Sequence, residues 1–469
     1  MFNIKNEKFT VFSKYSNLRL GSFYIPPNFK YKYKPFTEII EVYESGKRPK
    51  GGINPADYGQ AISLGGEQIG MDGRIDLSNI PYVSYDFYDK AEKGIVKNYD
   101  ILICKDGALT GKTCIVDFVK DSLVGKNVMV NEHVYIIRCN SQYNQQFLAY
   151  LMQTDFFQSQ IKDLAYRKKG QPGLNSDHIK ALKVLDIPLI EQNNIMKKIE
   201  PLEKKINRNN VQVPSVQNLI DEVFRKEFKF DYVKFNELKK INRFHSLFTD
   251  FARNIDSRFS VKFHRPAGEF VLQELNNITS SKIKSYLDIP IELGASISPC
   301  DYDENGKYLY ISMATIKSWE FDEENASGVS KVYSENNLNK TVKKGDIIMA
   351  RSGEGTIGKV AEIQKNISGV FADFTMRIRL KNYNTSFAYY YFRTSYFQYL
   401  IEVHKKGLGN NTNIFPIAIQ DFPIPDISLK KQASIVKEIR TSIDKLKILK
   451  EENVSLQNEI RSTIMDALQ

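Results

Sequence analysis

The chain has 469 residues, of which 42% are hydrophobic and 26% charged, and its formal net charge is +11. This length predicts two or three domains, and the apolar content excludes a disordered chain. The positive charge favours a polyanionic partner, with nucleic acid ahead of a membrane surface; a general abundance of lysine is the alternative explanation.

The cysteines and the N-terminal residues indicate a cytoplasmic protein. No cysteine belongs to a C-x-x-C pair or lies near a histidine cluster, so we expect reduced, mostly buried thiols rather than a zinc site or disulfides. Residues 1–20 lack the apolar core of a signal peptide, and no segment has the length of a membrane helix. The cysteines are Cys104, Cys114, Cys139 and Cys300.

The chain repeats itself. Three pairs of similar segments occur in the same order, at separations of 246, 240 and 240 residues. The small change in separation is typical of two copies of one fold that differ in loop length. The pairs are 96–103 with 342–349, 155–161 with 395–401, and 191–199 with 431–439.

Each copy has the same predicted order of elements. In the first copy, short β-type runs at 100–104, 114–118 and 134–138 precede a helical stretch that contains residues 155–161. A polar loop, an apolar run that ends at Pro188, and a long helix follow. The second copy ends its apolar run at Pro425.

The long helix that ends each copy has an apolar seam. Apolar residues recur every three or four positions from Ile435 to Leu468, and less regularly in the first copy, where Pro201 and Pro214 predict a kink or a break. We expect the two helices to pack as an antiparallel coiled coil, with Asn453 fixing the register; the alternative is that each helix packs on its own domain. The predicted contact residues of these partner helices are Ile195, Ile199, Leu202, Ile206, Ile439, Leu446, Asn453, Leu456 and Ile460.

Two glycine-rich segments resemble phosphate-binding loops without matching one. Residues 107–113 have one residue too few between the glycines, and residues 353–360 end in valine instead of serine or threonine. Strand-like residues follow both, so two strands joined by a glycine-rich turn fit better. Methyltransferase and nuclease motifs are missing, and the five histidines are scattered. The sequence predicts no catalytic residue and no metal site.

Basic and amide-rich loops occur at equivalent places in both copies. Lysine and arginine hold a protein on the DNA backbone, while glutamine, asparagine and arginine can read base edges. Plain solvated surface is the alternative. The predicted DNA-binding residues are Lys47, Arg48, Lys50, Lys105, Arg167, Lys168, Lys169, Gln171 and Asn175 in the first copy, and Arg351, Lys405, Lys406, Asn410, Asn411 and Asn413 in the second.

Together these features resemble the specificity subunit of type I restriction–modification enzymes. The likeness is carried by residues 345–353 with Gly358-Lys359, by their partner segment 100–112, by the two loops, and by residues 187–192. Lys431-Gln432 and Asn98-Tyr99-Asp100 depart from the usual Glu-Gln and Gly-Asp, and both departures concern packing.

The resemblance implies that the chain is a non-catalytic subunit. Each target-recognition domain would read one half of a split site in double-stranded DNA, and the helices would set the gap and dock methyltransferase subunits. Those partners would bind S-adenosylmethionine and methylate adenine, and an ATP-driven translocase subunit would cut unmodified DNA. No cofactor is expected in this chain; S-adenosylmethionine, ATP and Mg²⁺ are expected on the partner subunits.

The predicted fold class is α/β, in the α+β sense, with small mixed sheets in two repeated domains that long helices separate and join. Two other functions stay open: an enzyme that binds nucleotide or modifies DNA through its glycine-rich loops, and a coiled-coil scaffold. The predicted segments are an unassigned extension at 1–16, domain one at 17–188, a helical spacer at 189–230, domain two at 235–426, and a second helical spacer at 427–469.

Overall fold

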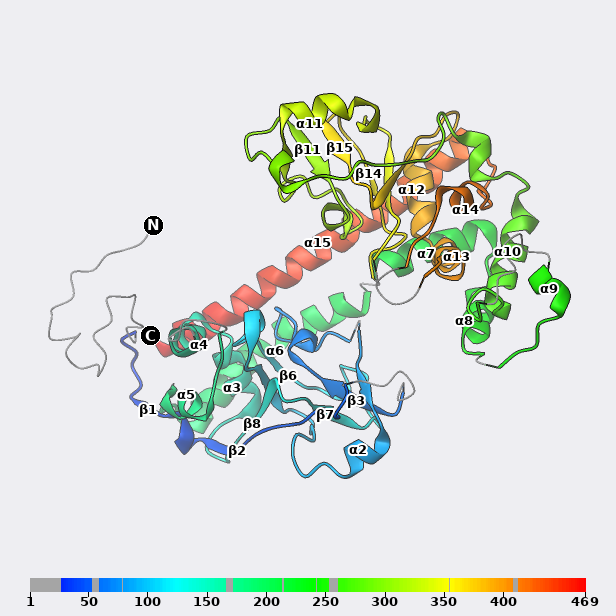
Figure 1. Ribbon diagram of the computed structural model, residues 1–469. Helices are drawn as coiled ribbons and strands as arrows, with labels where there is room; N and C mark the ends of the chain where they lie inside the picture. Colours follow the sequence, from blue (N-terminus) through cyan, green and yellow to red (C-terminus); the bar gives the residue numbers. More distant parts are fainter. Residues whose placement is uncertain are drawn as a thin grey trace. The chain divides into compact units, whose positions relative to one another are not determined.

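The computed structural model divides into two compact units (Figure 1). The first contains residues 1–212 and 449–469, and the second contains residues 213–448. Helix α15 (Leu429–Leu468) contributes its first half to the second unit and its second half to the first. The residues described are 27–52, 59–77, 79–165, 172–212, 215–241, 243–252, 260–353, 355–407 and 412–469.

Two small sheets form the centre of the first unit. A four-stranded antiparallel sheet has the order β2–β8–β5–β6, and a three-stranded sheet has the order β4–β3–β7, in which β3 and β7 are parallel. The strands are β2 (Ile40–Ser45), β3 (Ala61–Leu64), β4 (Tyr82–Val83), β5 (Ile101–Cys104), β6 (Thr113–Ile115), β7 (Val128–Val130) and β8 (Val134–Cys139).

Strand β5 is buried on both faces, which explains its unbroken apolar sequence. Because successive side chains of a strand point to opposite faces, Ile101 and Ile103 pack into the cluster that the helices cover. Leu102 and Cys104 pack into the cluster on the other face, toward the three-stranded sheet. The four-stranded sheet therefore lies between the helices and the smaller sheet.

The remaining elements of the first unit are helices and one short strand pair. Strand β1 pairs with β9, which forms part of the predicted apolar run before Pro188. These elements are β1 (Tyr33–Pro35), α2 (Tyr85–Asp89), α3 (Gln145–Met152), α4 (Asp155–Ala165), α5 (Ser176–Ala181), β9 (Lys183–Leu185) and α6 (Leu189–Gln212).

The second unit repeats this arrangement strand for strand. Its sheets have the orders β10–β16–β13–β14 and β12–β11–β15, and β11 and β15 are again the parallel pair. The predicted duplication and mixed sheets are confirmed. The strands are β10 (Glu292–Leu293), β11 (Tyr308–Ile311), β12 (Gly328–Val329), β13 (Ile347–Ala350), β14 (Val360–Glu362), β15 (Gly369–Phe371) and β16 (Thr375–Ile378).

The helices of the second unit include counterparts of those in the first and further ones. Helices α12 and α13 correspond to α3 and α4, and α14 corresponds to α5. The helices are α7 (Val216–Phe228), α8 (Tyr232–Lys239), α9 (Phe248–Ala252), α10 (Pro266–Ile278), α11 (Lys331–Asn336), α12 (Thr385–Arg393), α13 (Ser395–His404) and α14 (Pro416–Gln420).

A buried glutamine at the start of each long helix shows how closely the two units agree. The Gln192 side chain accepts a hydrogen bond from the backbone N–H of Asn144 (2.7 Å) and donates one to the carbonyl of Ile187 (2.7 Å). Gln432 makes the same two bonds, each 2.8 Å long, to groups 240 residues further along the chain. This glutamine fixes the long helix to the body of its domain.

The long helices pack against one another within each unit. In the first unit α6 and the second half of α15 run in opposite directions (Figure 1), and near the end of α6 Asn209 donates a hydrogen bond to Asn453 (2.9 Å). In the second unit α7 packs on the first half of α15, where Lys431 pairs with Glu227 (2.7 Å). The interlocking packing of a coiled coil stays a prediction.

The predicted seam residues lie on the buried side of these helices. Asn453 also donates to the side chain of Asn210 (2.8 Å), so the seam carries a small amide network. In the first unit Ile195, Ile199, Ile206, Leu456 and Ile460 are buried and Leu202 is half-buried, and in the second unit Ile439 and Leu446 are buried.

Of the kink or break predicted at Pro201, the break is wrong and the kink stays a prediction. Helix α6 continues through this residue as far as Gln212. A proline inside a helix costs about 3 kcal/mol, but Ile199 and Ile206 on either side are buried in the core, and their packing offsets that cost. Pro214 lies outside the described residues, between the end of α6 and the start of α7.

The domain limits given above stay a prediction, as does the role of residues 1–16, which lie outside the described part of the chain. Cys104 and Cys114 are buried, Cys139 is half-buried and Cys300 is exposed. No described helix is both long and apolar enough to cross a membrane.

Candidate nucleic-acid interface

The glycine-rich segments are turns between antiparallel strands. One joins β5 to β6 and the other joins β13 to β14, so a strand follows each turn where a phosphate-binding loop would have a helix. Gly111 and Gly358 have positive φ angles of 92° and 83°, and an added Cβ would lie within 3 Å of an isoleucine side chain on α4 or α13. Both glycines therefore hold their turn tightly against a helix. The predicted hairpin is confirmed.

A basic residue begins each turn, and the backbone holds it in the same way in both units. The N–H of Lys105 donates to the carbonyl of His133 (2.9 Å), and its own carbonyl accepts from Leu174 (2.7 Å). Arg351 makes the equivalent bonds with Phe374 (3.0 Å) and Ile414 (2.9 Å). Each basic residue thus lies between the start of a central strand and the end of a predicted DNA-reading loop.

The side chain of Arg351 lies beside an exposed aromatic ring. Its Nε donates to the carbonyl of Asp373 (2.9 Å), and its guanidinium carbon is 5.9 Å from the ring centre of Phe374, which is 47% exposed. In the first unit the Lys105 ammonium lies 4.9 Å from the Tyr135 ring. Cations beside aromatic side chains can contact phosphate and base together.

The first unit has an open cleft of about 810 Å³ at this place. Arg48 pairs with Glu132 (2.7 Å) at its edge, and the His133 ring lies between Glu132 (3.3 Å) and Asp106 (3.1 Å). Sequence reasoning passed over His133 as an isolated histidine. The feature that could have identified it is its position directly before β8, because Phe374 has the same position before β16.

The predicted DNA-binding residues have different surroundings. Lys47, Arg48, Lys50 and Lys406 are exposed, whereas Lys405 is paired with Glu402 (2.7 Å) and its side chain is 7% exposed. Asn175 caps helix α5 through the N–H of His178, and the backbone of Asn413 pairs with that of Lys406. Their contacts with DNA stay predictions. Arg167, Lys168, Lys169, Gln171, Asn410 and Asn411 lie outside the described residues.

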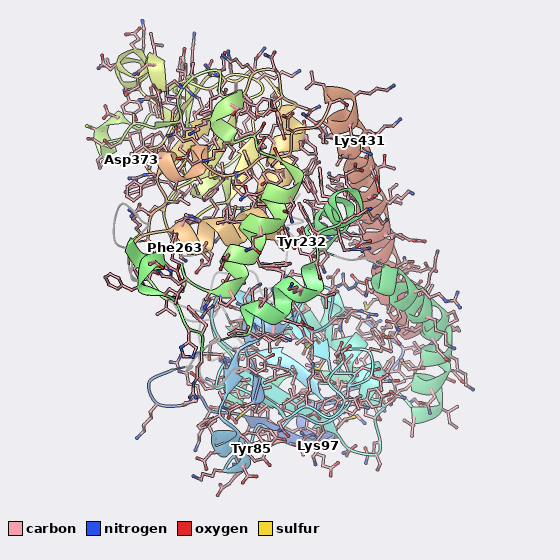
Figure 2. The ribbon with its side chains drawn as sticks, turned by 90° about the vertical axis from the view of Figure 1, so that its right-hand side faces the viewer. Tyr85, Lys97, Tyr232, Phe263, Asp373 and Lys431 are labelled. Carbon is pink, nitrogen blue, oxygen red and sulfur yellow. The ribbon has the colours of Figure 1, made fainter. Side chains whose placement is uncertain are left out.

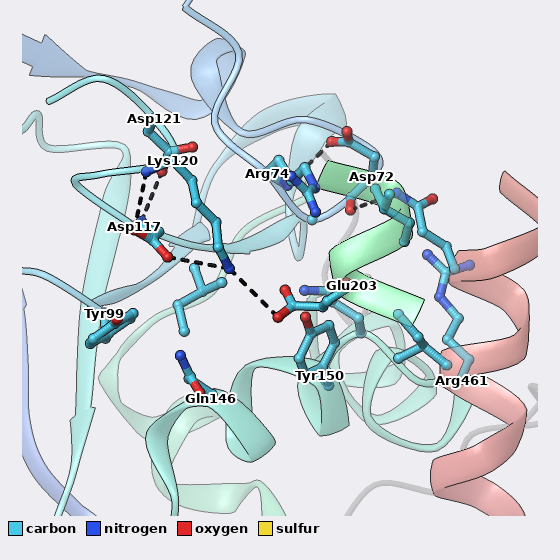
Figure 3. Close-up of a pocket in the computed structure, with 16 residues that line it drawn as sticks. Asp72, Arg74, Tyr99, Asp117, Lys120, Asp121, Gln146, Tyr150, Glu203 and Arg461 are labelled. Atoms are coloured by element: carbon cyan, nitrogen blue, oxygen red, sulfur yellow. Dashed lines mark hydrogen bonds and ion pairs between the residues drawn. The ribbon is translucent and has the colours of Figure 1, made fainter. Parts of the chain in front are cut away.

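A second, smaller cavity of about 50 Å³ lies against the helix pair of the first unit (Figure 3). On its wall Lys120 pairs with Asp117 (3.3 Å) and with Glu203 of α6 (3.6 Å). Burial raises the pKa of the nearby Asp121 carboxyl. The volume suffices only for a few water molecules, so these charges serve to tie α6 to the segment between β6 and β7.

The comparison with protein families decides what kind of chain this is. The model of the type I restriction modification DNA specificity domain matches it twice, at residues 28–215 and 277–458. The chain belongs to this specificity family. The two matches coincide with the two repeats described above, so the specificity chain contains two DNA specificity domains.

Two solved structures are similar to the specificity chain over nearly its whole length. The type I S subunit from M. genitalium is 13% identical and covers 95% of this chain and 98% of its own, with a TM-score of 0.42. The HsdS subunit from Thermoanaerobacter tengcongensis is 14% identical, with coverages of 96% and 98% and a TM-score of 0.32. The comparison with curated proteins gives no match.

Within the described ranges no three histidine, cysteine, aspartate or glutamate side chains of the specificity chain are grouped as metal ligands would be.

Proposed function

We propose that each domain of this specificity chain reads one half of a split site in double-stranded DNA. The observation that carries the proposal is the repeated position of Lys105 and Arg351, each held between the start of a central strand and a basic loop. Two copies of one reading surface in a single chain suit a target of two parts. Arg351 can donate to the O6 and N7 atoms of guanine, and Phe374 can contact an adjacent base or sugar.

The chain acts as a recognition subunit without a catalytic centre of its own. Its long helices set the gap between the half-sites and dock methyltransferase subunits, while a translocase subunit cuts. S-adenosylmethionine, ATP and Mg²⁺ belong to those partners. The complex works in the cytoplasm, where its DNA is.

The proposal is tested by mapping methylated adenines in the genome of cells with and without this gene, with the neighbouring methyltransferase gene intact. Loss of a split motif supports the proposal and reveals both half-sites. A methylation map that does not change contradicts it.

Variants of the two basic residues then test the division of labour. Arg351→Gln should relax the motif in one half only, and Lys105→Gln should relax it in the other half only, because each residue belongs to one domain. Lys365→Gln, a substitution of an exposed lysine on the second domain, is the control and should leave both halves unchanged. Relaxation of both halves by either variant would contradict one half-site per domain.

A further inference from the structure

A basic segment of the second unit lies outside both parts of the chain that match the family. The matches end at residue 215 and begin again at residue 277. Between them, residues 229–265 contain nine lysines and arginines against four aspartates and glutamates, a net charge of +5, while the whole chain carries +11. Nearly half of the excess positive charge is therefore concentrated in 37 residues.

Helix α8, within this segment, is fixed to helix α13 by aromatic packing. The buried ring of Phe235 lies 5.1 Å from the rings of both Tyr396 and Tyr399, measured between ring centres. At the end of α8, the Lys239 ammonium lies 5.9 Å from the Tyr399 ring. Since a helix rises 1.5 Å per residue, this contact is about 9 Å along α13 from Lys405.

The end of the segment reaches the start of the reading loop. Lys262 pairs with Glu402 (2.7 Å), and the ring centre of Phe263 is 5.2 Å from that of His404, the last residue of α13. Figure 2 shows Phe263 and Asp373 on one side of the second unit and Lys431 on the other. Asp373 is the residue whose carbonyl accepts from Arg351. Phe263 therefore lies on the side of the second unit that carries the reading surface, and Tyr232 at the start of α8 lies between that side and Lys431.

Helix α8 and its flanks present exposed cations. Lys229, Lys234, Lys240 and Arg243 are all exposed, and within the described part of the chain no ion pair involves Lys240 or Arg243. The same segment also exposes Leu247 and Phe248, so a protein is the competing partner. The high local positive charge beside a DNA-reading surface favours phosphate groups.

We infer that Lys229, Lys234, Lys240 and Arg243 bind phosphates of the DNA beside the half-site that the second domain reads. This inference rests on the proposed function and adds a second, sequence-independent contact to it. Phosphate contacts strengthen binding to all DNA sequences equally. The second domain would therefore hold DNA beyond the bases that it reads.

The test measures binding of the full chain to two labelled duplexes by fluorescence anisotropy across a range of salt concentrations. One duplex contains the mapped site and the other a scrambled one. The variant is Lys240→Gln with Arg243→Gln, and a second variant replaces both residues with glutamate. The control is Lys430→Gln with Lys437→Gln, two exposed lysines on α15, the helix that carries Lys431 on the opposite side.

Each lost phosphate contact should lower the slope of log K against log salt by about 0.9, which corresponds to about eightfold weaker binding at 0.1 M salt. The glutamine variant removes two contacts, so on both duplexes its slope should fall by about 1.8 and its binding should weaken about 60-fold. The glutamate variant should lose more, and the control should match wild type. Unchanged affinity and slope in both variants would overturn the inference, as would equal losses in the control.

The inference would also be overturned if the variants bound DNA as wild type does but no longer bound a partner protein. The segment would then be a protein-docking surface. The proposed function fails separately, if the wild-type chain binds the two duplexes equally. In that case the comparison of each variant with the control still shows whether the phosphate contacts exist, because those contacts do not depend on the DNA sequence. Thermal unfolding of each variant confirms that it is folded.

Discussion

Arg379 donates two parallel hydrogen bonds to the buried carboxylate of Asp346, from Nε (2.6 Å) and from Nη2 (2.7 Å). Arg138 makes the same two bonds to Asp100 in the first unit, at 2.5 and 2.6 Å. Arg138 lies in β8 and Arg379 directly follows β16, so each pair joins the end of one of these strands to the turn that precedes β5 or β13. The hydrogen bonds with Asp346 raise the pKa of the Arg379 guanidinium.

Arg379→Leu should lower the free energy of unfolding of the second domain by about 3 kcal/mol, because Asp346 would remain buried without its charged partner. Urea unfolding of the variant measures this loss. Lys365→Leu is the control, since the Lys365–Glu323 pair is exposed and should cost less than about 1 kcal/mol. Equal losses in the two variants would contradict a special role for the buried pair.

Tyr99 occupies a backbone conformation that its counterpart fills with glycine. The φ angle of Tyr99 is 66°, and that of Gly345 is 92°. Non-glycine residues are strained there by about 1 kcal/mol, so Tyr99→Gly should stabilise the first domain and Gly345→Ala should destabilise the second by similar amounts. A Cβ at Gly345 would meet only Thr385, at 3.8 Å, so steric clash adds nothing.

Thermal unfolding of the two variants tests this expectation. Gly345→Asn should cost less than Gly345→Ala, because asparagine tolerates the left-handed region better. A destabilised Tyr99→Gly variant would mean that the tyrosine side chain contributes more than its backbone strain costs.

The adjacent lysines of the second reading loop should separate into two roles. Lys405→Gln should lower stability, because Glu402 would lose a partner whose side chain is buried, whereas Lys406→Gln should weaken DNA binding and cost less stability than Lys405→Gln. Unfolding and anisotropy measurements on both variants give the two readouts. A loss of stability in Lys406→Gln alone would reverse the assignment.

This ion pair also predicts a pH dependence. Although burial opposes it, the bonds from Lys262 and Lys405 lower the pKa of the Glu402 carboxyl below its usual value. A group with a lowered folded-state pKa contributes stability above its unfolded pKa of about 4.3, and this contribution is lost as the pH falls through the folded value. As the pH falls from about 5 through the folded-state pKa of Glu402, the Lys405→Gln variant should therefore lose less stability than the wild-type chain does.

Gln432→Ala should destabilise the second domain by about 3 kcal/mol, because a backbone N–H and a carbonyl would be left buried without partners. Lys430→Ala, two residues earlier and exposed, should change stability by less than about 0.5 kcal/mol. Urea unfolding distinguishes the two. If Gln432→Ala lowered stability no more than Lys430→Ala does, the prediction would be contradicted, and water would have to replace both hydrogen bonds of Gln432.

The duplication, the central strands and the seam could be predicted because each leaves a periodic or repeated pattern. Ile101 to Cys104 is apolar throughout, since both faces of β5 are buried, and the same pattern recurs 246 residues later. Gln192 and Gln432 fall in segments that the repeat already matched, although their hydrogen bonds could not be deduced.

The rest depends on contacts between residues far apart in the sequence. The burial of Lys405 depends on Glu402 and its surroundings, and the continuity of α6 through Pro201 depends on core packing. Phe374 and His133 became candidates only when the backbone placed them beside Arg351 and Lys105. Helix α8 has no counterpart among the repeated segments, so the repeat gave no signal for it.

The division of α15 between the two units has a consequence for synthesis on the ribosome. Leu456, Ile460, Ile464 and Leu468 complete the core that contains Ile199 of the first unit. More than 240 residues separate the end of α6 from Leu456, and they must be translated before this core is complete. Part of the apolar surface of the first domain therefore stays exposed to solvent while the second domain is synthesised. Folding of this chain is thus ordered by its last helix, and a nascent chain stalled before residue 449 should be captured by chaperones.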